Sequence, residues 1–188
     1  MQLGMADRAR GLAEQKLSEV LPRRWRHVQA VAARAEQLAS LIEEPHDREL
    51  LVSAATLHDI GYAPSIAKTG FHPLDGARWL RDLKFSDRVA ALVAHHTNAV
   101  VEAELRGFDR ELSDEFDREM SRVADLLWYC DLTTGPDGQE FTVEERIAEI
   151  RNRYEPGSVV VEFIELSAGE FFEVVKRVED WIRPTQPM

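Results

Sequence analysis

The sequence predicts an all-α fold, and three observations support this prediction. Apolar residues recur at helical spacing in successive segments along most of the 188 residues. Helix-start signals precede several of these segments, including Pro22, Ser86 and the capping-box pair Thr142 and Glu145. Residues 158–166 are rich in Val, Ile and Phe and resemble a strand, but no second strand is available to pair with them. We therefore expect this stretch to be helical as well.

The N-terminal half is expected to contain four helices, each with one apolar face. Their expected ranges are 5–20, 23–42, 47–58 and 72–83. His27 and His58 continue the apolar stripes of the second and third helices, so both imidazoles are expected to point into the core. Gly61 is expected to cap the end of the third helix.

The C-terminal half is expected to contain further helices, separated by an acidic segment and a Gly-Pro-rich loop. A helix is expected to begin at Ser86, and others to span 98–106, 117–132, 142–154, 158–166 and 168–182. His96 and Asp131 continue apolar stripes that include Leu92 and Met120, whereas His95 need not point the same way as His96, because adjacent helical residues differ by about 100°. Residues 107–116 are expected to be irregular or weakly helical, and residues 184–188 to form a frayed tail.

Composition restricts the class of protein. The net charge of −11 disfavours non-specific binding to nucleic acids or anionic membranes, which depends on basic patches. A single cysteine, Cys130, rules out an intramolecular disulfide and is expected in the core. No apolar run is long enough to cross a bilayer, and the N-terminus lacks the apolar block of a secretory signal. We therefore expect a cytoplasmic protein with one domain, and no nucleic-acid or membrane partner.

Ionisable side chains on buried faces are the main functional signal. A lone histidine on an apolar face is usually a satisfied core residue, but here the predicted helices carry several such groups. They are His27, His58 with Asp59, His96 and Asp131, and His72 and His95 lie near helix ends. Burying so many imidazoles and carboxylates is costly unless they are hydrogen-bonded or coordinated. Both groups are good ligands for divalent transition metals, so the sequence predicts a metal site.

The order of these residues resembles the HD superfamily of metal-dependent phosphohydrolases. The resemblance covers residues 27–132 and rests on four segments together. They are Arg26-His27-Val28, Leu57-His58-Asp59-Ile60-Gly61, His72-Pro73-Leu74-Asp75-Gly76-Ala77 and His95-His96-Thr97, with Asp131 after an apolar run.

The resemblance implies a helical bundle around a metal centre. It implies a metal-binding core over residues 23–132, with a C-terminal helical extension over 142–184. A first ion would be held by His27, His58, Asp59 and Asp131. A second would be completed by His72, His95 and His96, with Asp59 bridging. Two ions would favour Fe or Mn, while a single ion could be Mn, Co, Ni, Zn or Mg.

The implied activity is hydrolysis of a phosphoester of a nucleotide or another small phosphorylated metabolite by metal-activated water. Asp59 and His58 are the expected catalytic residues. Two alternatives remain open at this point. One is a diiron oxygenase on the same scaffold, and the other is a non-catalytic regulatory module that binds metal or nucleotide.

One position departs from the family pattern. Many members have a lysine soon after His-Asp that helps to bind phosphate, and Tyr62 stands there in this chain. Lys68 or Arg78 could supply the missing cation to the substrate. Arg151 and Arg153 are expected to lie on a helix surface. The sequence does not predict the oligomeric state.

Overall fold

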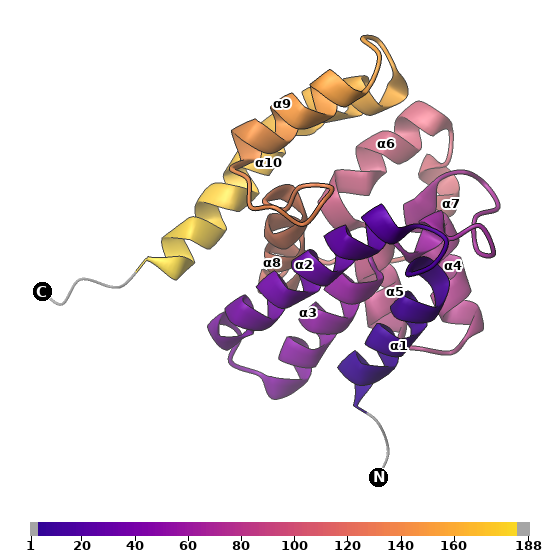
Figure 1. The fold of residues 1–188 in the computed structure, drawn as a ribbon, viewed down its shortest axis with the longest axis vertical. Helices are drawn as coiled ribbons and strands as arrows, with labels where there is room; N and C mark the ends of the chain where they lie inside the picture. The colour runs from indigo at the N-terminus through magenta and orange to yellow at the C-terminus, as the bar shows by residue number, and fades with distance from the viewer. Residues whose placement is uncertain (1–3, 184–188) are drawn as a thin grey trace, which may run out of the picture.

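Helix α3 (Pro45–Leu57) lies at the centre of the structure, and every residue of its second half is buried. Its mainly apolar run from Leu50 to Leu57 has no exposed face, which is typical of a helix that is surrounded on all sides. It packs against four helices from both halves of the chain: α1 (Met5–Leu17), α2 (Pro22–Leu38), α5 (Asp87–Ala94) and α8 (Arg122–Leu132). The computed structural model describes residues 4–183, in which these helices form an all-α bundle without a β-strand (Figure 1).

The other helices surround this centre. They are α4 (His72–Asp82), α6 (Ala99–Arg106), α7 (Asp109–Glu115), α9 (Val143–Arg153) and α10 (Val159–Ile182), with short 3-10 turns η1 (Ala39–Leu41), η2 (Ile60–Tyr62) and η3 (His96–Asn98). Helices α9 and α10 lie together along one side of the bundle (Figure 1). Helix α10 also packs along α8 and α6. None of the described helices combines the length and the hydropathy needed to cross a bilayer.

The all-α prediction is confirmed, with differences in the bounds of several helices. The two helices expected over 158–166 and 168–182 are one helix, α10, which begins where Ser158 Oγ accepts a hydrogen bond from the Val161 amide. Residues 109–115 form the helix α7. Helix α8 begins five residues later than expected, at Arg122, so Met120 lies before it and is 77% exposed. The predicted frayed tail, residues 184–188, lies outside the described residues.

Gly61 has a different role from the helix cap that was expected. It lies in the turn η2, which packs on the first turn of α4. A Cβ atom on Gly61 would lie 2.0 Å from the carbonyl oxygen of His72 and 2.7 Å from the amide nitrogen of Gly76. Only glycine permits this approach of two backbones. The contact brings the end of α3, with Asp59, next to His72 at the start of α4.

Candidate metal centre

Six of the seven predicted ligands lie together in two groups. The first group is His27, His58 and Asp131, and the second is Asp59, His72 and His96. Within each group the potential ligand atoms all lie within 4.8 Å of one another. Five segments supply them: α2, the end of α3, the start of α4, the turn η3 and the end of α8. Ligands that share one ion at bond lengths of about 2.0–2.2 Å lie roughly 3–4 Å apart, so each group is close to this spacing.

The carboxylate of Asp59 lies between the two groups. Its Oδ2 atom is 3.4 Å from Nε2 of His58 and 3.8 Å from Nε2 of His27. Its Oδ1 atom is 3.3 Å from Nε2 of His72. One oxygen therefore faces each group, which is the arrangement that a bridging carboxylate requires.

Hydrogen bonds to the backbone determine the tautomers of three histidines. The Nδ1 atoms of His27, His58 and His96 lie 2.6–2.9 Å from the carbonyl oxygens of Gly135, Ala55 and Val93. A carbonyl only accepts, so each Nδ1 carries a proton and each Nε2 is the nitrogen directed at the centre, where it could offer a lone pair to an ion. This orientation is typical of histidines that ligate metals.

The Nε2 atoms of these histidines and of His72 face one another at short range. Nε2 of His27 lies 3.4 Å from Nε2 of His58, and Nε2 of His96 lies 3.2 Å from Nε2 of His72. Two lone pairs at this distance repel unless a proton or a cation lies between them. The donor set therefore fits divalent transition metals, which the six residues would hold through imidazole nitrogens and carboxylate oxygens.

The charges of the centre favour positive ions. Burial lowers the pKa of His58, but the charge and hydrogen bond of Asp59 outweigh it and, with Asp131, raise this pKa to about 9. Burial and the neighbouring His72 and His58 lower the pKa of His96 to about 3. Burial raises the pKa of Asp59 and Asp131, but their cationic and hydrogen-bonding neighbours keep both pKa values well below the usual range. Two ionised carboxylates are thus buried at the centre, and the raised pKa of His58 shows that they stabilise a positive charge beside them.

Thr97 orients the carboxylate of Asp131. Its hydroxyl donates to Oδ2 of Asp131, while Oδ1 of the same carboxylate lies 3.2 Å from Nε2 of His27. Thr97 adopts left-handed backbone angles, with φ 49° and ψ 46°, which a β-branched residue rarely does. Strained residues of this kind cluster at functional sites, and here the strain places a hydroxyl on a candidate ligand.

Arg24 is a residue of the centre that the sequence interpretation missed. Its Nη1 atom donates to Oδ2 of Asp59 at 2.6 Å, and its guanidinium lies over the ring of Tyr62, with Cζ 4.0 Å from the ring centroid. The spacing contained a signal, because Arg24 precedes His27 by three residues on α2 and therefore lies on the same face.

A cavity of about 240 Å³ opens beside the two groups. A single water needs only about 10–15 Å³, so this space could accommodate a small organic molecule. Four arginines contribute to its lining: Arg24, Arg106, Arg146 and Arg153. Apolar and aromatic side chains from the C-terminal helices complete it, including Ile150, Tyr154, Val160, Phe163 and Ile164. Arg153 is exposed on the surface of α9, as expected, and its side chain also lines this cavity.

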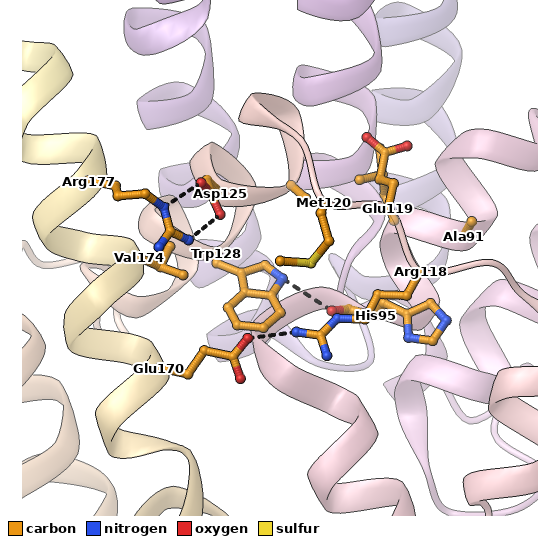
Figure 2. Close-up of a pocket in the computed structure, with 12 residues that line it drawn as sticks. Ala91, His95, Arg118, Glu119, Met120, Asp125, Trp128, Glu170, Val174 and Arg177 are labelled. Carbon is orange, nitrogen blue, oxygen red and sulfur yellow. Dashed lines mark hydrogen bonds and ion pairs between the residues drawn. The ribbon is translucent and has the colours of Figure 1, made fainter.

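His95 lies outside both groups, which corrects the expected ligand set. Its Nε2 is 2.7 Å from the carbonyl oxygen of Phe116, so Nε2 donates and is not free for an ion. The ring belongs to a second pocket beside α8, where Trp128 donates to the carbonyl of His95 and Arg118 pairs with Glu170 (Figure 2). This pocket has a volume of about 20 Å³, which is enough for about one water. Position 95 directly follows the last residue of α5, and helical spacing no longer predicts direction there.

Neither of the expected substrate cations lies at the cavity. Lys68 is exposed, and its backbone amide donates to Asp75 in the loop before α4. The guanidinium of Arg78 is paired with Glu115 on α7. The substrate role expected for Lys68 and Arg78 therefore has no geometric support. Cys130 is buried, and burial raises the pKa of its thiol to about 12, as expected for a core residue.

Of the comparisons with known proteins, the one with family models agrees with the HD interpretation. The family model described as HD domain matches residues 24–157. A tRNA (cytidine(56)-2'-O)-methyltransferase from Picrophilus torridus is 35% identical over 79 residues, which are 42% of this chain. The matched segment is 22% of that relative, so the similarity spans about a fifth of its length. No solved structure matches. Because the family model covers well over half of the sequence and the expected HD ligands converge in space, the chain belongs to the HD domain family.

Proposed function

We propose that this protein is a metal-dependent phosphohydrolase that hydrolyses a phosphoester of a nucleotide or another small phosphorylated metabolite. One observation carries the proposal: the carboxylate of Asp59 lies between two groups of potential ligands and lines an arginine-rich cavity. Divalent ions held by these residues would act as Lewis acids toward a phosphoryl group and would lower the pKa of a coordinated water. Fe or Mn suits a histidine-rich pair of sites, and a single Zn, Co, Ni or Mg is the alternative.

The charge of the cavity supports an anionic substrate. The chain as a whole carries a net charge of −11, yet four arginines line this one space beside three carboxylates, Asp59, Glu102 and Asp131, two of which are candidate metal ligands. Arginine presents a planar fork of N–H donors that matches phosphate geometry. These arginine side chains would attract a phosphorylated molecule and orient it in the cavity.

The rest of the cavity supports an organic group on that substrate. Phe163 and Ile164 from α10 and Ile150 from α9 present apolar surface to the same space as the arginines. Ligand pockets commonly combine an apolar lining with a few well-placed polar groups. A nucleotide or a comparable metabolite would use both parts of this lining.

His58 and Asp59 are the proposed catalytic residues. His58 is held by its bond to Ala55, so its free nitrogen stays directed at the carboxylate of Asp59. Asp59 is ionised and would accept a hydrogen bond from the attacking water, which would position this water toward the phosphorus atom. We do not propose methyl transfer to tRNA, because only 22% of the methyltransferase is matched and the net charge of this chain disfavours an RNA partner.

A substrate panel tests the proposal. Protein loaded separately with Mn, Fe, Zn, Co, Ni or Mg would be incubated with nucleoside monophosphates, nucleoside polyphosphates, sugar phosphates and phosphodiesters. We expect release of phosphate or of a nucleoside monophosphate with at least one metal. His58→Ala and Asp59→Ala should abolish it, while His46→Ala should not, since His46 is exposed on α3.

Two outcomes would contradict the proposal. One is a complete absence of turnover across the panel for protein whose metal content is confirmed by elemental analysis. The other is turnover that persists unchanged in His58→Ala. Oxygen consumption by the iron-loaded protein, with a mixed-valent EPR signal, would instead support the diiron oxygenase.

A further inference from the structure

The ion pair between Arg24 and Asp59 is unusual among the arginines of the cavity. Arg106 pairs with Glu102, and Arg146 and Arg153 both pair with Glu149. Those glutamates belong to neither ligand group. Within the cavity lining that the structure describes, Arg24 is the arginine whose carboxylate partner is itself a candidate metal ligand.

Because of this pairing, metal binding at Asp59 would change the strength of the ion pair that holds Arg24. The bond from Arg24 is made to Oδ2 of Asp59, the same oxygen that faces His27 and His58. A cation bound there would partly neutralise the negative charge of this carboxylate, and the carboxylate would then attract the guanidinium less strongly. The positive charge of Arg24 would then need a new anionic partner.

Tyr62 would keep the guanidinium beside the centre after that change. Its ring contacts the guanidinium of Arg24 at 4.0 Å and stacks on the ring of His72, with centroids 4.0 Å apart and planes inclined by 17°. Both Tyr62 and Arg24 line the cavity. A cation–π contact of this kind restricts where the guanidinium can go, since it holds the group over the ring face.

Arg24 also has donors to spare. A guanidinium carries five N–H groups, and the structure gives one hydrogen bond for Arg24 among the described residues, from Nη1. The side chain is 26% exposed, compared with 4% for its partner Asp59, so part of it faces the open space of the cavity. Two parallel N–H groups suffice for a bidentate contact with a phosphate.

We propose that Arg24, held over Tyr62, is the residue that binds the phosphoryl group of the substrate next to the metal centre, and that it exchanges its bond to Asp59 for this contact when metal is present. The inference rests on the phosphohydrolase function proposed above, because it names the residue that would recognise the substrate phosphate. It gives Arg24 a specific role that Lys68 and Arg78, which lie elsewhere, cannot fill.

Binding of inorganic phosphate tests this role without turnover. Isothermal titration calorimetry would give the Kd of phosphate for the metal-loaded wild-type protein and for Arg24→Gln. We expect the Kd to rise at least tenfold in Arg24→Gln while the metal content, measured by elemental analysis, stays that of the wild type. Arg24→Lys should give an intermediate Kd, since it keeps the charge and loses the fork.

Arg23→Gln is the matched control on the same turn of α2. Arg23 does not line the cavity and binds Asp137, which keeps a second partner in Arg26. Its phosphate Kd should change less than twofold. An unchanged Kd in Arg24→Gln, a loss of metal that accounts for the weaker binding, or an absence of phosphate binding by the metal-loaded wild type would overturn the inference. If Arg24→Gln does not fold, the same criteria apply to Arg24→Lys.

This experiment separates the inference from the proposed function. If the wild-type protein hydrolyses no phosphoester but binds phosphate through Arg24, the proposed function is contradicted and the role of Arg24 is supported. If the wild-type protein hydrolyses phosphoesters and Arg24→Gln binds phosphate with the same Kd, the proposed function is supported and the role of Arg24 is contradicted.

Discussion

At the scale of single residues, four of the six candidate ligands are held by a second contact that leaves one atom directed at the centre. His27, His58 and His96 donate through Nδ1 to backbone carbonyls. Asp131 accepts from Thr97 through one oxygen and faces His27 through the other. Preorganisation of this kind reduces the entropy that binding an ion would otherwise cost.

Replacement of Thr97 by valine tests this preorganisation. Valine keeps the shape and the β-branch of threonine, so the main change is the loss of the hydrogen bond to Asp131. Loss of such an outer contact typically lowers metal affinity by about 10–100-fold. A competition titration against a chelator would measure it, with Thr97→Ser as the control that keeps the hydroxyl. Equal affinities for the valine and serine variants would contradict the assigned role.

Replacement of Gly61 by alanine tests the backbone contact that brings Asp59 to His72. The new Cβ would lie 2.0 Å from a backbone oxygen, which cannot move like the end of a side chain. Overpacking costs roughly 1–3 kcal/mol, and we expect the upper end, or about 6–12 °C in Tm for a chain of this size. Gly11→Ala on α1 is the control, because nothing lies within 4 Å of its Cβ and helix propensity predicts a small stabilisation. A Tm for Gly61→Ala within 2 °C of the wild type would show that the turn can relax.

Helical spacing predicted some of the site residues and could not predict others. His27 and His58 continue clear apolar stripes, and the structure buries both. His95 and Thr97 lie where α5 ends and the backbone enters left-handed angles, so no periodic rule applies there. Arg24 was predictable in principle from its spacing to His27, but nothing in the sequence indicates that its partner is Asp59.

At the scale of elements, the C-terminal helices form the wall of the cavity. Helix α9 contributes Arg146, Ile150 and Arg153, and α10 contributes Phe163 and Ile164. The candidate ligands all precede this region in the sequence. The candidate ligands therefore come from segments that precede α9, and the last two helices would determine what reaches them.

Replacement of Arg146 by methionine tests the role of α9. The side chain of Arg146 is 9% exposed and lines the cavity, and its partner Glu149 keeps a second ion pair with Arg153. We expect KM for an accepted phosphoester to rise about tenfold, with kcat within about threefold of the wild type, because the lost contact binds ground state and transition state alike. Arg151→Met is the control on the same helix, since Arg151 is 48% exposed and does not line the cavity. A KM that is the same in both variants would contradict this role for α9.

Helix boundaries were predicted correctly where the sequence contains a strong capping signal. The capping box of Thr142 and Glu145 is present at the start of α9, as predicted. The start of α8 was placed too early because Met120 fits the apolar spacing, although Ser121 is the residue whose side chain caps the helix. The split of α10 was wrong because the Val-, Ile- and Phe-rich residues 158–166, which resemble a strand, belong to one long apolar stripe that packs on α8, and Gly169 does not interrupt it.

At the scale of the whole molecule, the central position of α3 explains why the ligands meet. His58 and Asp59 follow directly on the buried end of this helix, and the helices that carry His27 and Asp131 pack against it. Resemblance to the HD superfamily predicted that these residues converge. The cavity was not predictable from spacing, because its lining comes from residues between Arg24 and Ile164 that only the folded chain brings together.

The dispersed origin of the ligands predicts that metal stabilises the entire fold. The unfolded chain separates the six residues over a span from His27 to Asp131, so ions bind the folded state in preference. An ion at about 1,000 times its Kd would add roughly 4.1 kcal/mol, which corresponds to about 8–16 °C in Tm for a chain of this size. Thermal denaturation of chelator-treated protein, with and without added Mn or Fe, measures the shift. Asp59→Ala removes the carboxylate that faces both groups and should lose most of it, whereas a wild-type Tm that does not respond to any divalent metal would contradict a metal centre at these residues.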